Sequence, residues 1–278
     1  MIYLCLAILG CVGMSVSLKV SENAKISYYG MMSVNYFVAM LIAFGIAMGQ
    51  SGQIQFNGTV LMLGLITGTL YCLTLILCRY NIGKSGAILA TTFMQLGVLV
   101  PIVLSFVVWR EIPSVIQMIG IVLSVLAIIL ISSNDKKAPK SFMAGLLLLL
   151  FSAGFADSMP KFFSTCEMPD NSAGFMFCTF VLSFLICLTL AVFQKEKLSL
   201  KILTHGTVLG VTNFCASWFL LLAVAKLPAY LVYPMYSVIS IVITAIISMI
   251  FFKEKLEKKQ WLGMLIVLFS VAFLNLYV

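Results

Sequence analysis

The chain contains the stretch WREIPSVIQMIG at residues 109–120 and a related stretch, FKEKLEKKQWLG, at residues 252–263, 143 positions later. Each stretch begins with an aromatic residue, a basic residue and a glutamate, and has a glutamine and a glycine at matching places further on. Other residues return 142 positions later, namely Gly64 as Gly206, Gly68 as Gly210 and Lys19 as Lys161. These constant spacings predict that the chain is an internal duplication.

The composition is that of an integral membrane protein. Of the 278 residues, 62% are hydrophobic and 9% are charged, whereas a soluble domain carries about 25% charged residues. The net charge is +8, but no cluster of basic and aromatic residues lies outside the apolar runs, so we expect no nucleic acid partner. The eight cysteines contain no CxxC pair, which favours small packing residues over disulfides or a metal site.

Apolar runs predict ten membrane spans, because a spanning helix needs about 20 apolar residues. The predicted spans are residues 2–20, 28–49, 58–79, 85–108, 114–132, 142–163, 172–193, 204–225, 229–251 and 259–277. A polar stretch divides them into a first five-helix repeat at 1–134, a connecting loop at 135–140 and a second five-helix repeat at 141–278. An odd number of spans in each repeat inverts the second repeat relative to the first, as in many secondary transporters.

The loop charges predict the orientation of these spans. All but three of the 17 lysines and arginines fall on one side of the membrane, the exceptions being Arg110, Lys161 and Lys226. The positive-inside rule places the larger group in the cytoplasm. We therefore predict a multi-pass protein of the cell membrane with both termini outside.

The repeated stretches carry a resemblance to a known family. A short turn precedes the last two helices of each repeat, as Lys-Ser-Gly-Ala at residues 84–87 and Lys-Leu-Pro-Ala at residues 226–229. With the glutamate and the glycine that follow, the whole chain resembles the EamA branch of the drug/metabolite transporter superfamily. The resemblance implies an all-α membrane protein with its two inverted five-helix repeats around a central cavity. It also implies alternating access, and substrates among amino acids, amines, vitamins, nucleotide sugars and drugs.

The chain departs from one group of relatives. Small four-helix multidrug exporters of this superfamily carry a glutamate in their first membrane helix. The first span here has none, and Ser15 and Ser17 are its strongly polar interior residues. A direct copy of that proton/drug exchange is therefore not expected.

Asp157 is the strongest single candidate for a substrate-binding residue. It lies about seven residues before the end of its span, roughly 10 Å inside the membrane. An acid at such a position costs at least ~2.5 kcal/mol and usually faces an interior cavity, where Asp157 could bind a cation or accept a proton. Lys161 follows one turn later, beyond Pro160, so the alternative is a structural ion pair near the membrane edge.

Polar and aromatic side chains in other spans complete the expected site. The predicted substrate-binding residues are Asp157, Tyr233, Tyr236, Trp218, Asn213, Gln95 and Tyr71. A cavity lined by these side chains could hold an ammonium group by cation–π attraction or stack a flat heterocycle. The alternative for the tyrosines is an aromatic belt at the membrane interface.

Two further pairs of residues recur at matching positions. Inversion places Lys19 and Lys161 at opposite mouths of a transport path, where they could act in gating or attract anionic groups, although such lysines often extend to the membrane surface instead. Glu111 and Glu254 precede helices expected to begin near Pro113 and Lys258. A carboxylate there favours the helix N-terminus, which predicts a structural role.

No catalytic constellation is present. The sequence contains no Gly-x-Ser-x-Gly, no phosphate-binding loop and no cluster of metal ligands, so we predict neither an enzyme nor a cofactor. We predict a transporter that moves a small polar or amphipathic metabolite, such as an amine, amino acid, vitamin or drug-like solute. The expected partners are this small-molecule substrate and the lipid bilayer, with proton coupling and a monomer or homodimer left open. The alternative is a non-transporting membrane sensor or assembly module.

Overall fold

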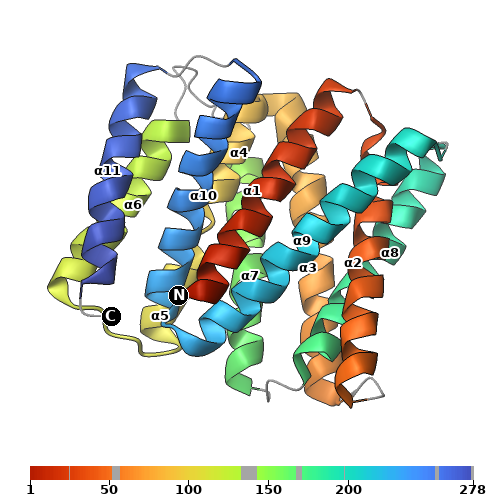
Figure 1. The fold of residues 1–278 in the computed structure, drawn as a ribbon, viewed down its shortest axis with the longest axis horizontal. Coiled ribbons are helices and arrows are strands. Elements are labelled where there is room, and N and C mark those ends of the chain that lie inside the picture. Colours follow the sequence, from red (N-terminus) through yellow and green to blue (C-terminus); the bar gives the residue numbers. More distant parts are fainter. Residues whose placement is uncertain are drawn as a thin grey trace. The chain divides into compact units, whose positions relative to one another are not determined.

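The computed structural model describes residues 1–24, 26–51, 57–132, 143–166, 171–196, 198–253 and 257–276. The secondary structure of these residues is helical (Figure 1). The helices are α1 (Ile2–Asn23), α2 (Tyr28–Ser51), α3 (Gly58–Ser85), α4 (Ala87–Leu96), α5 (Leu99–Val107), α6 (Val115–Ser132), α7 (Met143–Cys166), α8 (Ser172–Phe193), α9 (Leu200–Lys226), α10 (Ala229–Phe251) and α11 (Lys258–Asn275). The predicted connecting loop at 135–140 and Glu254 lie outside the described residues.

The all-α fold class is confirmed, and the predicted spans match helices with one modification. Among the described residues, eight helical segments are long and apolar enough to cross a membrane, one of them being Leu89–Val107, which includes most of α4 and all of α5, and α6 is a shorter apolar helix. The span predicted at 85–108 consists of two helices, α4 and α5, separated by a turn at Gly97 and Val98. Within this turn, Gly97 N bonds to Met94 O and Val98 N bonds to Gln95 O. These tighter bonds between residues three apart replace the α-helical ladder.

Contacts divide the chain into two compact units, which we describe separately. Unit 1 comprises Met1–Cys72 and Met159–Ala225, and unit 2 comprises Leu73–Ser158 and Lys226–Val278. Helices α3 and α7 each continue from one unit into the other. Each unit therefore contains helices from both sequence repeats.

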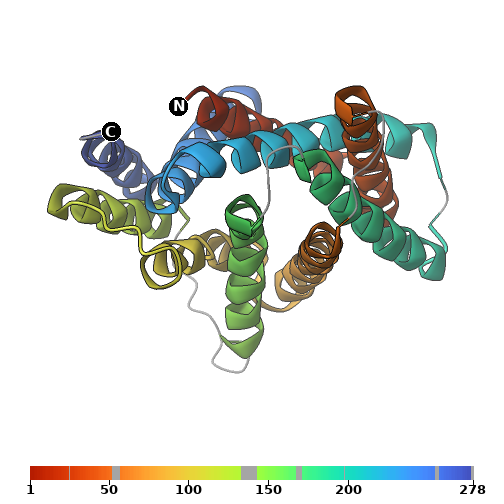
Figure 2. The same cartoon turned by 90° about the horizontal axis from the view of Figure 1, so that it is seen from below.

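In unit 2 the last helices of the two repeats, α6 and α11, lie side by side and antiparallel (Figures 1 and 2). Gln117 at the start of α6 donates to Leu274 O at the end of α11, at 3.5 Å. Gln260 at the start of α11 donates to Ile131 O at the end of α6, at 3.1 Å. Both donors and both acceptors are 143 positions apart, so the duplicated glutamines make one contact twice.

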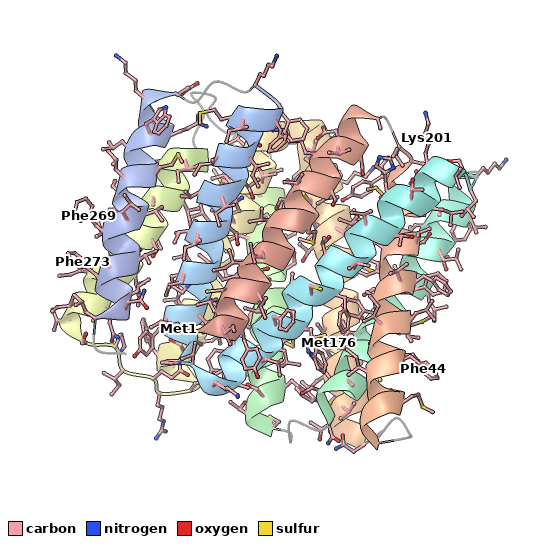
Figure 3. All side chains as sticks on the ribbon, viewed as in Figure 1. Met1, Phe44, Met176, Lys201, Phe269 and Phe273 are labelled. Carbon is pink, nitrogen blue, oxygen red and sulfur yellow. The ribbon has the colours of Figure 1, made fainter. Side chains whose placement is uncertain are left out.

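The duplicated glycines of this helix pair behave in the same way. A Cβ atom built at Gly120 would lie 3.1 Å from Ser270 O, and one built at Gly263 would lie 3.2 Å from Ala127 O. The outer face of α11 is apolar, and Phe269 projects from it away from α6 (Figure 3). The motif that revealed the duplication in the sequence is thus the motif that joins the two repeats.

Each of these glutamines also caps its own helix. Ser114 N donates to Gln117 Oε1 at 2.9 Å, and Glu257 N donates to Gln260 Oε1 at 2.8 Å. The side chain at the third helical position thereby satisfies a backbone N–H that the helix leaves open, which is the capping-box arrangement. One amide side chain therefore serves the start of its own helix and the end of the opposite one.

In unit 1 the other duplicated glycines allow close helix contacts. They are Gly64 and Gly68 on α3, and Gly206 and Gly210 on α9. A Cβ atom built at Gly68 would lie 2.6 Å from Thr179 O of α8, and one built at Gly210 would lie 2.6 Å from Asn35 O of α2. Glycine at these positions lets the helix backbones approach closely, and in each case the third helix of one repeat contacts the second helix of the other.

Candidate substrate-binding site

The turn between α4 and α5 lies against α7 in unit 2. A Cβ atom built at Gly97 would lie 2.9 Å from Gly154 N and 3.0 Å from Leu150 O. Glycine at both Gly97 and Gly154 therefore allows the two backbones to touch. Asp157 follows Gly154 by almost one helical turn, and its side chain is half-buried. The turn between α4 and α5 therefore contacts α7 three residues before Asp157, the acid predicted from the sequence to bind substrate.

The other predicted site residues of unit 2 come from α4 and α10. Gln95 is half-buried and lies in the last turn of α4, next to the break. Tyr236 is half-buried on α10, whereas Tyr233 is only 1% exposed. A tyrosine of an interfacial belt faces lipid or water, so the burial of Tyr233 argues against that alternative for this residue. Helix α10 packs against α5, which leads away from the same break.

In unit 1 the predicted residues Asn213 and Trp218 lie on α9 but make different contacts. Asn213 Nδ2 donates to Asn35 Oδ1 of α2 at 3.2 Å, whereas the Trp218 ring stacks on Phe214 with centroids 5.7 Å apart. Five residues of a helix with 3.6 residues per turn separate two side chains by about 140°. Tyr71 on α3, half-buried, occupies the position equivalent to Asn213 in the first repeat.

Further aromatic contacts connect Phe214 to α8 and α2. Phe214 contacts Phe180 of α8 with centroids 6.2 Å apart, and Phe180 contacts Tyr36 of α2 at the same centroid separation. These supporting residues and Asn35 are not among the residues predicted from the sequence. The available signal for Asn35 is an amide within an otherwise apolar span, because such amides commonly bond to a neighbouring helix.

Lys161, one of the two predicted gating lysines, bonds to a backbone carbonyl of α9. Its side chain is 9% exposed, and Nζ donates to Val224 O at 3.0 Å. Val224 lies in the last turn of α9, where backbone carbonyls have no partner within the helix and a positive charge is favoured. Lys161 is therefore held inside unit 1 by this hydrogen bond. Lys19 is half-buried on α1.

Glu111 has the kind of structural role that was expected, but at another helix. Its Oε2 accepts a hydrogen bond of 2.6 Å from Ala229 N, the first residue of α10. The expectation was that Glu111 would favour the helix that follows it in sequence. That helix, α6, instead begins with the capping box of Ser114 and Gln117, so the carboxylate is available to α10.

Comparisons with known proteins agree with the fold and the duplication. The EamA-like transporter family matches residues 1–133 and again residues 141–276. A Haemophilus influenzae protein named "Uncharacterized protein" is 22% identical over 284 residues, which cover 96% of this chain and 94% of that protein. A crystal structure of a protein aligns with a TM-score of 0.81 and 11% identity, over 99% of this chain and 96% of the other. Since the family pattern covers nearly the whole chain in two copies, the chain belongs to the EamA-like transporter family.

Proposed function

We propose that this protein carries a small polar or amphipathic metabolite across the cell membrane by alternating access, as a facilitative or secondary active transporter. Its family consists of membrane transporters of the drug/metabolite type, and the substrate class and mechanism are our proposal. Amines, amino acids, vitamins and drug-like solutes remain the candidates. Proton coupling and a monomeric or homodimeric state remain open within this proposal.

The observation that carries the proposal is the break between α4 and α5 beside α7. Gly97 and Val98 keep right-handed helical backbone angles, so this break is a short 3₁₀ turn and not an unwound segment. A 3₁₀ stretch in the middle of a helix often marks a functional hinge, which alternating access requires. The break here adjoins Gly154, within one turn of Asp157. We assign Asp157 as the main charged group of the site.

The remaining residues have supporting roles in this proposal. The polar and aromatic groups that shape and orient the substrate are Tyr233, Tyr236, Gln95, Trp218, Asn213 and Tyr71. Trp218 offers a rigid ring, because Phe214 is stacked on it at an interplanar angle of 17°. Lys19 and Lys161 are the candidates for gating or charge attraction at the two mouths.

A tryptophan fluorescence titration tests this site together with transport. The chain has three tryptophans, so replacing Trp109 and Trp261 by Phe leaves Trp218 as the single emitter. A substrate found in a thermal-shift screen of amines, amino acids, nucleosides and vitamins should change the Trp218 emission and show counterflow in liposomes. The matched control keeps only Trp261, which is 49% exposed on α11, and its emission should not change.

The possible results separate the two candidate functions. Binding without counterflow would favour the sensor or assembly module over a transporter. An emission change in the Trp261 control, with none from Trp218, would contradict the assigned site.

We also propose that both termini lie outside. In unit 1, Gly30 N near the start of α2 bonds to Glu196 Oε2 at 2.5 Å. This contact brings the start of α2 to the segment between α8 and α9, which carries Lys195 and is followed by Lys201 at the start of α9. Such a basic end is expected in the cytoplasm. A reporter enzyme fused to the C-terminus should be active outside the cell, and activity only in the cytoplasm would overturn the orientation.

A further inference from the structure

Two buried cysteines meet between α3 and α8 in unit 1. The Sγ atoms of Cys72 and Cys187 are 4.0 Å apart, and the residues are 2% and 0% exposed. Cys72 Sγ also donates to Ser183 O at 3.6 Å. Cys72 follows Gly68 by one turn of α3, so the close helix contact at Gly68 also holds the two sulfurs together.

The spacing of the sulfurs is closer to that of a metal bridge than to that of a disulfide. A disulfide requires sulfurs about 2.05 Å apart, which is about half of the observed 4.0 Å. A metal–sulfur bond of about 2.3 Å, as for zinc, places two sulfurs on opposite sides of an ion about 4.6 Å apart. Small rotations of the two side chains suffice for this change.

The ligand set selects the class of metal ion. Zinc sites usually have four protein ligands, or three and a water, and calcium and magnesium prefer oxygen ligands. Two sulfur ligands suit a soft ion that accepts two-coordinate geometry, and thiolates favour copper(I). The burial of both cysteines favours an assembly without net charge, which a monovalent ion forms with one thiolate and one neutral thiol.

We infer that Cys72 and Cys187 form a two-coordinate site for a soft monovalent metal ion of the copper(I) and silver(I) class. On binding, one thiol loses its proton to the solvent and forms a sulfur–metal bond, and the second sulfur donates a lone pair. No oxidation state changes. The bound ion joins α3 to α8 within unit 1. This inference is independent of the proposed substrate and of the transport mechanism.

Silver(I) is the appropriate probe because it needs no reductant. Cys5 and Cys166 are exposed and Cys11 and Cys215 are half-buried, so all four are first replaced by serine. The full-length protein in this background is incubated with silver nitrate in chloride-free buffer and desalted. We expect it to retain one silver ion per chain by elemental mass spectrometry and to melt at a higher temperature than the silver-free protein.

Single substitutions in this background decide the assignment. Cys72→Ser and Cys187→Ser should each lose the retained silver and the increase in Tm. Cys78→Ser should keep both, because Cys78 packs against the apolar Ala90 and Leu149. Alanine variants replace any serine variant that does not fold. Silver retained after either of the first two substitutions, or lost equally after Cys78→Ser, would overturn the site.

Discussion

Asp157→Asn is expected to abolish substrate counterflow in liposomes and to leave the protein folded. Asparagine has nearly the same shape, and the side chain is only half-buried, so packing should persist. What is lost is the negative charge within a membrane helix, where an ionisable group is costly and usually functional. A hydrogen bond to a charged group contributes about 1.5–3 kcal/mol, which corresponds to more than a tenfold change in affinity.

Two further variants separate this role from a structural ion pair. Asp157→Glu keeps the charge and should retain part of the transport. If Asp157 only neutralises Lys161, the double variant Asp157→Asn/Lys161→Gln should recover the activity that Asp157→Asn loses. If both groups act in transport, the double variant should remain inactive. Unchanged transport with unchanged pH dependence in Asp157→Asn would end the assignment.

The duplication was predictable because the residues that recur lie in short stretches of sequence and return at nearly constant spacings. Gln117 and Gln260 stand at a constant spacing in the sequence, and the structure shows why both copies retain the amide. Each caps its own helix and bonds to the end of the other one. Two antiparallel copies of one helix make the same contact twice, so a repeated motif corresponds to a repeated interaction.

Features that depend on contacts between distant segments were not predictable in the same way. The close contact at Gly97 leaves no room for a side chain at Gly154 on the facing helix, and the apolar run 85–108 gives no sign of that neighbour. Lys161 follows Asp157 by one turn in the sequence, yet its Nζ donates to the carbonyl of Val224. A backbone carbonyl has no sequence signature, so hydropathy alone favoured extension of this lysine to the membrane surface.

Glycines that lie at close helix contacts cannot be told from the sequence alone from glycines that have no neighbouring side chain or backbone. Gly68 and Gly210 occupy equivalent positions, and a Cβ at either one would lie 2.6 Å from a backbone carbonyl of the facing helix. Gly45 also lies in a membrane helix of unit 1, but a Cβ there would meet nothing within 4 Å. These positions therefore separate the cost of steric contact from the intrinsic preference of a helix for alanine over glycine.

Gly68→Ala and Gly210→Ala should each destabilise the purified protein in detergent by about 1–3 kcal/mol, the usual cost of overpacking. Gly45→Ala should be neutral or stabilising by up to about 1 kcal/mol, because alanine favours helix more than glycine does. Denaturant-induced unfolding of all three variants gives the comparison. Because the contacts at Gly68 and Gly210 repeat each other, their two effects should be similar.

Equal stability of Gly45→Ala and Gly68→Ala would mean that α3 and α8 do not approach as closely as described. Destabilisation by only one of Gly68→Ala and Gly210→Ala would instead mean that the two repeats have diverged in how their third helices pack.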